Sequence, residues 1–288
     1  MRQNIAFLSH DQNISGHLYC PEKFKAPLPV VILCHTFCGV KDWLLPSYAI
    51  FFAQNGYAAL TFDYRGFGQS QGESGRFNTE RQVEDILAAI DYIKCLDFID
   101  ADRIALWGSF FGGANAIVAA ACDKRVKCLI AQLPFADGSQ LLTHTLTEAD
   151  ERRFYQTLAR MQNKKVTTGR EMVVPISKVL TDSASADFYK EHREQFPSLG
   201  IKIPYLSTAE ILSLKPEQYI KDITAPILLV GAEHDAVNPA GAIKRLYDLA
   251  QEPKKLHTET GAAHYEMYSG KCFLRCAKQQ QAWLDQYC

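Results

Sequence analysis

The chain has 288 residues, of which 47% are hydrophobic and 22% charged, the ordinary composition of a globular protein. Its formal net charge of −1 at pH 7 gives no indication of a polyanionic partner such as nucleic acid. No apolar run approaches the roughly 18 residues of a membrane span, and the opening residues MRQNIAFLSHDQNISG lack the pattern of a signal peptide. We therefore expect a cytoplasmic protein with neither a membrane nor a nucleic-acid partner.

The first half of the chain alternates between predicted strands and helices. Two alternating segments, NIAFLSHD and NISGHLYCP, predict an N-terminal hairpin. The continuous apolar run PVVILCH is typical of a strand covered on both faces, and YAALTFDY predicts the next strand. Further elements are predicted as helices at 45–55, 79–95 and 111–122 and strands at 103–107 and 126–132. Such alternation predicts a mostly parallel sheet with right-handed crossovers.

The alternation stops between about 137 and 220, where the chain is polar and irregular, and then resumes. APILLVG and KKLHTET predict two more strands, followed by helices near 239–250 and 270–286, respectively. We interpret 137–220 as a helical cap over the carboxyl edge of the sheet. The predicted architecture is thus an α/β core of residues 1–136 and 221–288, with helices on both faces of the sheet and a cap insertion at 137–220.

Nine cysteines are many for this length, and their odd number and apolar surroundings favour free thiols in a reducing compartment. Cys272 and Cys276 lie four apart on a predicted helix, but no second Cys/His pair with zinc-like spacing accompanies them. The sequence therefore predicts no metal. The spaced glycines of GFGQSQG lack the context of a dinucleotide fingerprint, so no cofactor is predicted either.

The segment RIALWGSFFGGANAI predicts a strand, a sharp turn and a helix, the layout that presents a serine nucleophile in the frame Gly-x-Ser-x-Gly. Here Phe110 occupies the central position of that frame, and Ser109 stands one place early. Asp235 and His264 follow two later predicted strands, and strand ends are where an α/β sheet places reactive groups. Either residue alone is as well explained by a turn or an exposed loop, but the order turn, acid, histidine is specific.

On these residues the chain resembles α/β hydrolases of the dienelactone-hydrolase-like branch, which includes fungal polyketide transferases and related thiohydrolases. The segments that carry the resemblance are CHTFCGVKD, GYAALTFDYRGFGQSQGE, VEDILAAIDYI, DADRIALWGSFFGG, VKCLIAQLPFADG, APILLVGAEHDAVNP and HYEMYSG. It implies the α/β-hydrolase fold, with His264 as general base oriented by Asp235. It also implies an oxyanion hole formed by the backbone N–H groups of Phe37 and Phe111.

The sequence departs from the family at the nucleophile, because a phenyl ring cannot attack a carbonyl group. Ser109 is a poor substitute, since the turn presents one side chain and a one-residue slip would misplace the glycines. Cys38, in the predicted oxyanion loop, is a second alternative, although a small packing residue explains it as well. In the same loop, Thr36 replaces the family's usual glycine.

Several functions remain compatible with this site. The preferred one is an enzyme acting on an ester, thioester or β-keto carbonyl substrate with no covalent intermediate, because removing one triad member leaves substantial catalysis in serine proteases. The alternatives are a pseudoenzyme that binds a small apolar ligand, a Ser-to-Phe substituted form of an active serine hydrolase or acyltransferase, and a replacement nucleophile.

Three structural expectations follow. Phe110 should have a positive φ, and the side chains of Asp235 and His264 should lie within hydrogen-bonding distance. An apolar substrate pocket should form from Phe37, Cys38, Trp43, Phe110 and Phe111. The expected partner is a small acyl or carbonyl molecule, and a homodimer is left open.

Overall fold

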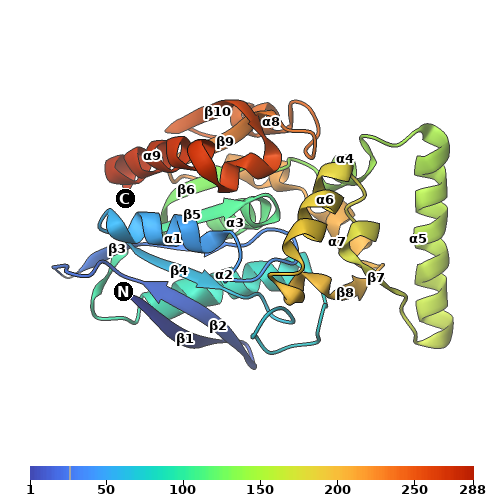
Figure 1. The fold of residues 1–288 in the computed structure, drawn as a ribbon, viewed down its shortest axis with the longest axis horizontal. Coiled ribbons are helices and arrows are strands. Elements are labelled where there is room, and N and C mark those ends of the chain that lie inside the picture. The colour runs from blue at the N-terminus through green and yellow to red at the C-terminus, as the bar shows by residue number, and fades with distance from the viewer. Residues whose placement is uncertain (26) are drawn as a thin grey trace.

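An eight-stranded sheet forms the centre of the computed structural model, which describes residues 1–25 and 27–288 (Figure 1). The strand order is β1-β2-β4-β3-β5-β6-β9-β10. Strand β2 pairs antiparallel with both β1 and β4, whereas β4, β3, β5, β6, β9 and β10 run parallel to one another. The strands are β1 Arg2–Ser9, β2 Gln12–Tyr19, β3 Leu28–Cys34, β4 Ala58–Phe62, β5 Ile99–Ser109, β6 Val126–Gln132, β9 Ile227–His234 and β10 Lys254–Ala263. The parallel sheet and the N-terminal hairpin agree with the sequence prediction.

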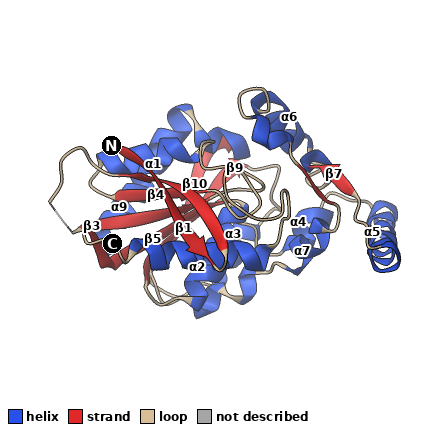
Figure 2. Ribbon diagram, turned by 90° about the horizontal axis from the view of Figure 1, so that it is seen from below, coloured by secondary structure: helices blue, strands red, loops and turns tan. Residues whose placement is uncertain are grey.

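Helices cover both faces of the sheet, as Figures 1 and 2 show. They are α1 Leu45–Gln54, α2 Thr79–Ile93, α3 Phe111–Cys122, α8 Ala242–Leu249 and α9 Gly270–Tyr287. Alternate residues of each buried strand point to opposite faces, so that Val31 and Leu33 join the core beneath α1 and α9. Val30 and Ile32 join the core beneath α2, α3 and α8. Both faces are apolar, which explains the continuous hydrophobic runs of these strands.

Residues 137–220 depart from the strand–helix alternation and form a smaller group of elements beside the sheet (Figure 1). They comprise α4 Gly138–Thr143, α5 Glu148–Thr168, α6 Ser183–His192, α7 Ser207–Ser213, and the short strands β7 Val173–Pro175 and β8 Lys202–Pro204. Helix α6 packs against Trp43, which follows β3. In contrast, α5 lies at the outer edge, with Leu158 as its buried residue. The division of the chain into core and cap stays a prediction.

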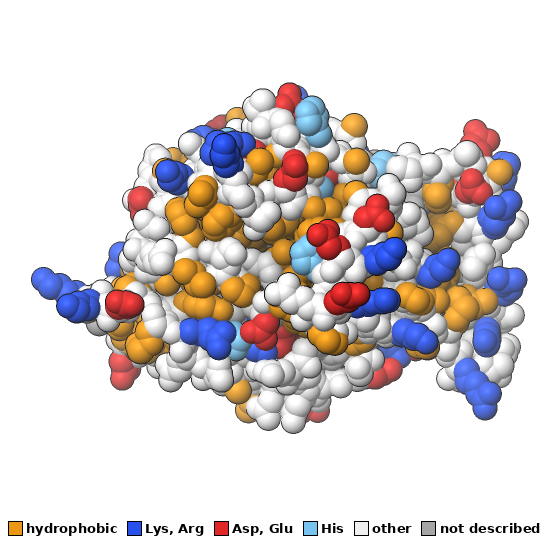
Figure 3. All heavy atoms as spheres, in the orientation of Figure 1, with side chains coloured by type: hydrophobic (Ala, Val, Ile, Leu, Met, Phe, Trp, Pro, Cys, Tyr) orange, Lys and Arg blue, Asp and Glu red, His pale blue; other side chains and the backbone are white. Residues whose placement is uncertain are grey.

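The surface of the described residues carries mixed charge. On the face in Figure 3, acidic and basic side chains are interspersed over the core, and basic side chains gather around α5. Within the described part of the chain, none of the helices combines the length and the hydropathy that crossing a bilayer requires.

Candidate active site

The turn between β5 and α3 holds Phe110 in a backbone conformation that bulky residues rarely adopt. Its φ is 54° and its ψ is −112°, at a cost of about 1–3 kcal/mol. Two glycines make this turn fit. A Cβ on Gly108 would lie 2.2 Å from the carbonyl oxygen of Gly112, and one on Gly112 would lie 2.0 Å from that of Cys34. The glycines therefore fix the register, and the predicted positive φ falls on Phe110.

The Phe110 side chain lies against the candidate base. Its ring centroid is 4.9 Å from that of His264 with an interplanar angle of 82°, an edge-to-face arrangement. Phe111 and Phe135 pack on it at 4.8 and 5.9 Å, and the Phe110 side chain is only 1% exposed. The position that the family gives to a serine hydroxyl thus holds a buried hydrocarbon ring.

Asp235 and His264 form the predicted pair. His264 begins the 3₁₀ turn η5 (His264–Tyr268) after β10, and its Nδ1 lies 2.9 Å from Oδ1 of Asp235, the first residue after β9. Because a carboxylate can only accept, Nδ1 donates this hydrogen bond, and in the neutral imidazole the lone pair lies on Nε2. That Nε2 is buried and has no hydrogen-bond partner among the described residues. A base with a free lone pair is therefore in place.

The Asp235 carboxylate is held by more than the histidine. The backbone N–H groups of Val237 and Asn238 donate to Oδ1 at 2.9 and 3.0 Å, and the Asn238 amide donates to Oδ2 at 2.9 Å. Burial by itself raises the pKa of Asp235, but the His264 interactions and these N–H donors outweigh it and leave the pKa below its usual range. Asp235 is accordingly an ionised, oriented acceptor. Sequence reasoning missed Asn238, whose place three residues after Asp235 is the signal of such a turn.

The predicted oxyanion donors, Phe37 and Phe111, lie on adjacent segments, with ring centroids 4.7 Å apart. Within the described residues, no protein acceptor takes the backbone N–H of either one. The Tyr189 hydroxyl, from α6, donates to the carbonyl oxygen of Phe37 at 2.6 Å and so fixes the loop after β3. No motif marks Tyr189 in the sequence, because its role depends on the packing of α6.

Ser109 points to the other face of the sheet. Its Oγ lies 2.6 Å from the Tyr268 hydroxyl and 3.4 Å from the amide nitrogen of Gln132. This is the consequence of strand alternation: Ser109 shares the α1/α9 face with Trp107, whereas Phe110 belongs to the core on the opposite face. These contacts argue against Ser109 as a replacement nucleophile and make Tyr268 its structural partner.

Cys38 is also a poor nucleophile. It is 2% exposed, and burial raises the pKa of its thiol well above the usual value, which disfavours the reactive thiolate. Its φ of 51° indicates that it serves the tight turn of the loop after β3. The packing explanation of Cys38 therefore fits the structure better than the catalytic one.

The predicted aromatic pocket is filled rather than open. Phe37, Phe110 and Phe111 pack with Phe77 and Phe135 into one cluster of buried rings. Trp43 belongs to the same buried core cluster, but its ring contacts are with His35 and three rings of α6. The phenyl rings contact one another because all of them are buried in the same apolar core.

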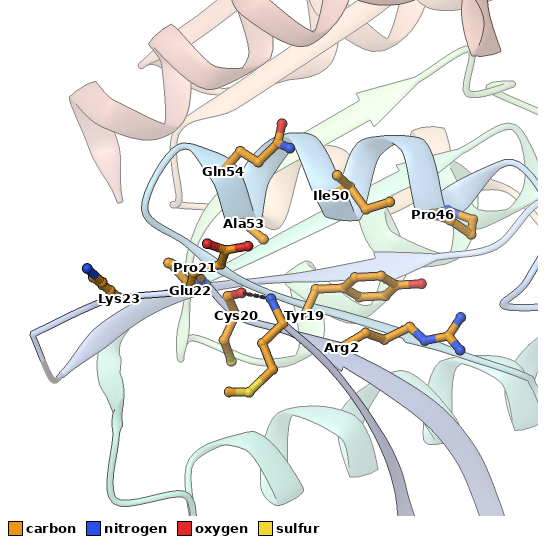
Figure 4. A pocket seen from close by; sticks show the side chains of 11 residues that line it. Arg2, Tyr19, Cys20, Pro21, Glu22, Lys23, Pro46, Ile50, Ala53 and Gln54 are labelled. Carbon is orange, nitrogen blue, oxygen red and sulfur yellow. Dashed lines mark hydrogen bonds between the residues drawn. The ribbon is translucent and has the colours of Figure 1, made fainter.

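Two cavities help to locate an open site. One of about 330 Å³ borders His264 and is lined by Ala184, Phe188, His234, Ala236, Ala263, His264, Tyr265, Glu266 and Ser269; Phe110 is not among them. A larger one, of about 650 Å³, lies between the N-terminal hairpin and α1 (Figure 4) and contains none of the predicted site residues. The first has His264 in its wall, although Nε2 itself is buried.

Comparisons with known proteins identify the family of the chain. The family model described as serine aminopeptidase, S33, matches residues 25–268. A 31.7 kDa protein of the traX-finO intergenic region of Escherichia coli is 43% identical over 260 residues, covering 90% of this chain and 91% of its own. The quorum-quenching protein AidA of Acinetobacter baumannii is 29% identical over 96% of this chain and 92% of its own.

A third relative is similar to this chain in both sequence and structure. The polyketide transferase GrgF of a Penicillium species is 28% identical over 84% of this chain and 83% of its own. Its crystal structure superposes with a TM-score of 0.83, at 23% identity, over 100% of this chain and 99% of that one.

Proposed function

Because the chain belongs to the serine aminopeptidase S33 family of α/β hydrolases, we propose that it acts on a small ester, thioester or β-keto carbonyl substrate with no acyl-enzyme intermediate. The α/β-hydrolase fold and the relationship to polyketide-transferase-like hydrolases, both predicted from the sequence, are confirmed. The observation that carries the proposal is the His264–Asp235 pair, with a 2.9 Å hydrogen bond at Nδ1 and a free lone pair at Nε2.

In the proposed reaction, Nε2 of His264 takes a proton from water or from the substrate. Asp235 stabilises the imidazolium that results, as the acid of a triad does. The backbone N–H groups of Phe37 and Phe111 receive the oxygen on which negative charge develops. Phe110 packs edge to face on the base and forms no bond to the substrate. Residues 137–220 act as the cap, with Phe188 of α6 lining the cavity beside His264.

The test is the dependence of turnover on His264. The purified protein is assayed with p-nitrophenyl acetate and with an acyl thioester, alongside His264→Ala, Asp235→Asn and the exposed control Tyr155→Ala. We expect single-phase kinetics without a product burst, abolished by His264→Ala and lowered by about 10²–10⁴-fold in Asp235→Asn, since general base catalysis and its orientation contribute on that scale. Turnover that persists in His264→Ala would refute the proposal.

A second candidate is ligand binding with no turnover, and the packing of Phe110 on His264 favours it. A ring at 4.9 Å from the base occupies space that a substrate carbonyl would need. If the unmodified protein shows no turnover but small acyl compounds raise its melting temperature, and Phe188→Ala removes that rise, ligand binding is the function.

A further inference from the structure

A cluster of metal-binding side chains lies outside the candidate active site, between β10 and α9. His257 and Glu259 are two residues apart on β10 and therefore point to the same face of the strand. Cys276 lies on α9, which packs beside β10 (Figure 1). One ligand atom from each of the three lies within 4.8 Å of the others.

Glu259 is the centre of this cluster, and its two oxygens have different partners. Oε1 accepts from the Arg275 guanidinium, whereas Oε2 lies 3.1 Å from Nε2 of His257 and 3.5 Å from Sγ of Cys276. The Glu259 carboxyl group therefore lies between a thiol and an imidazole, and the Arg275 guanidinium is its ion-pair partner.

Two of the three ligand-atom separations suit a tetrahedral ion, whereas the widest in the cluster extends to 4.8 Å and must shorten when the ion binds. Zinc bonds of about 2.0–2.3 Å place neighbouring ligand atoms roughly 3.3–3.8 Å apart, close to the two distances measured at Oε2 of Glu259. Imidazole, thiolate and carboxylate are the three ligand types that zinc uses in proteins. The His257 side chain is 24% exposed, so a water molecule can supply the fourth ligand from the solvent side.

We propose that His257, Glu259 and Cys276 form a binding site for a zinc-like divalent cation. Binding replaces the Cys276 S–H bond by a sulfur–metal bond and releases the proton to solvent. The site ties α9 to β10. The sequence predicted no metal, because no second pair with zinc-like spacing accompanies Cys272 and Cys276. In the folded chain, His257 and Glu259 of β10 lie beside Cys276 instead.

Two features weaken the binding of a cation at this cluster, and one of them suggests a variant for the test. Burial, followed by the charge of Glu259, raises the pKa of the Cys276 thiol, and the Arg275 guanidinium already pairs with Glu259. Arg275 is about half exposed, so it can be replaced without opening the core. If the three residues hold an ion, Arg275→Ala removes a competing cation and strengthens binding.

The experiment is a Co²⁺ titration of the chelator-treated protein, followed by absorbance, with Zn²⁺ affinity from calorimetry. We expect a thiolate-to-cobalt charge-transfer band and the intense visible bands of tetrahedral cobalt, both absent in Cys276→Ser and retained in Cys95→Ser, a control at an exposed cysteine. His257→Ala, which alters a partly exposed residue and preserves the buried core, should weaken Zn²⁺ binding by at least about tenfold.

The same titration can overturn the proposal. A wild-type spectrum without the charge-transfer band, or a His257→Ala variant that binds as tightly as wild type, would show that the cluster is an ion pair beside a buried thiol. Weaker binding in Arg275→Ala than in wild type would contradict the proposal as well. Melting curves of each chelator-treated variant confirm that it is folded.

Discussion

The ring of Phe110 meets the ring of His264 edge to face, with 4.9 Å between their centroids. A serine hydroxyl at this position could donate a hydrogen bond to His264. The phenyl ring of Phe110 packs against the imidazole instead. The rest of the site is assembled around that contact, with Asp235 bonded to Nδ1 and the backbone turn in its strained form. The consequences can be measured one at a time.

The backbone of Phe110 is strained and its side chain packs in the core. Two variants separate the contributions of the strain and of the packing to stability. Both Phe110→Ala and Phe110→Gly lose the buried ring, at about 3–5 kcal/mol of unfolding free energy. Glycine adopts a φ of 54° without strain, so Phe110→Gly should be more stable than Phe110→Ala by about 1 kcal/mol, the reverse of the usual order. Urea unfolding of both variants measures this; Phe110→Ala as the more stable of the two would show that the turn is not strained.

Ser109 should act as a structural residue. Ser109→Ala leaves the Tyr268 hydroxyl buried without its 2.6 Å partner and should lower the unfolding free energy by about 1–3 kcal/mol. Adding Tyr268→Phe removes the other partner too, so the double variant should lose less than the sum of the single ones. Any turnover should be nearly unchanged. If Ser109→Ala abolished turnover and a fluorophosphonate adduct mapped to Ser109, our placement of the serine would be wrong.

His35 should make the fold sensitive to acid. It is 1% exposed, and burial lowers its pKa to about 4, below the usual 6.5 or so. The unfolded chain therefore binds a proton that the folded chain does not, and stability falls as the pH drops from about 6.5 towards 4. Between pH 7 and 5 this amounts to about 2 kcal/mol. Urea unfolding of wild type and His35→Asn at both pH values tests it: an equal pH dependence in the two proteins would exclude His35 as the cause.

Phe188 should influence substrate binding through the cap. Its ring stacks on Tyr265 with 3.9 Å between centroids and lies 5.6 Å from that of Trp43. Phe188→Ala should raise the KM for a turned-over ester or thioester several-fold and change kcat less, because the proposed function places α6 against the substrate away from the reacting atoms. Steady-state kinetics beside Tyr155→Ala provide the comparison. Identical parameters for the two variants would remove α6 from the substrate site.

The sequence predicted the elements with strong local signals. Strand β6 and helix α3 have the predicted bounds, 126–132 and 111–122, because apolar runs and glycines mark their ends. Local signals were weaker for α2, which ends at Ile93 and not at 95, and for β5, which extends beyond 103–107 to Ile99–Ser109.

The parts of the site that rest on motifs in the sequence could be predicted. The parts that depend on packing between distant segments could not. The turn at Phe110 and the pairing of Asp235 with His264 follow from motifs at strand ends. Tyr189 on the Phe37 carbonyl does not, since that contact joins residues 152 positions apart. The closed aromatic cluster was missed for the same reason: composition shows that rings are present, but only packing decides whether they enclose a space or fill it.

The most direct measurement of the central claim is active-site labelling of Phe110→Ser by a fluorophosphonate, read by intact mass and peptide mapping. The unmodified protein should remain unlabelled, because among residues 1–25 and 27–288 no hydroxyl lies within hydrogen-bonding distance of Nε2 of His264. Phe110→Ser should gain one adduct at position 110 and a product burst with p-nitrophenyl acetate, and the added change His264→Ala should suppress both. Labelling of the unmodified protein at any site in this turn, or a folded Phe110→Ser variant that stays unlabelled, would contradict the account.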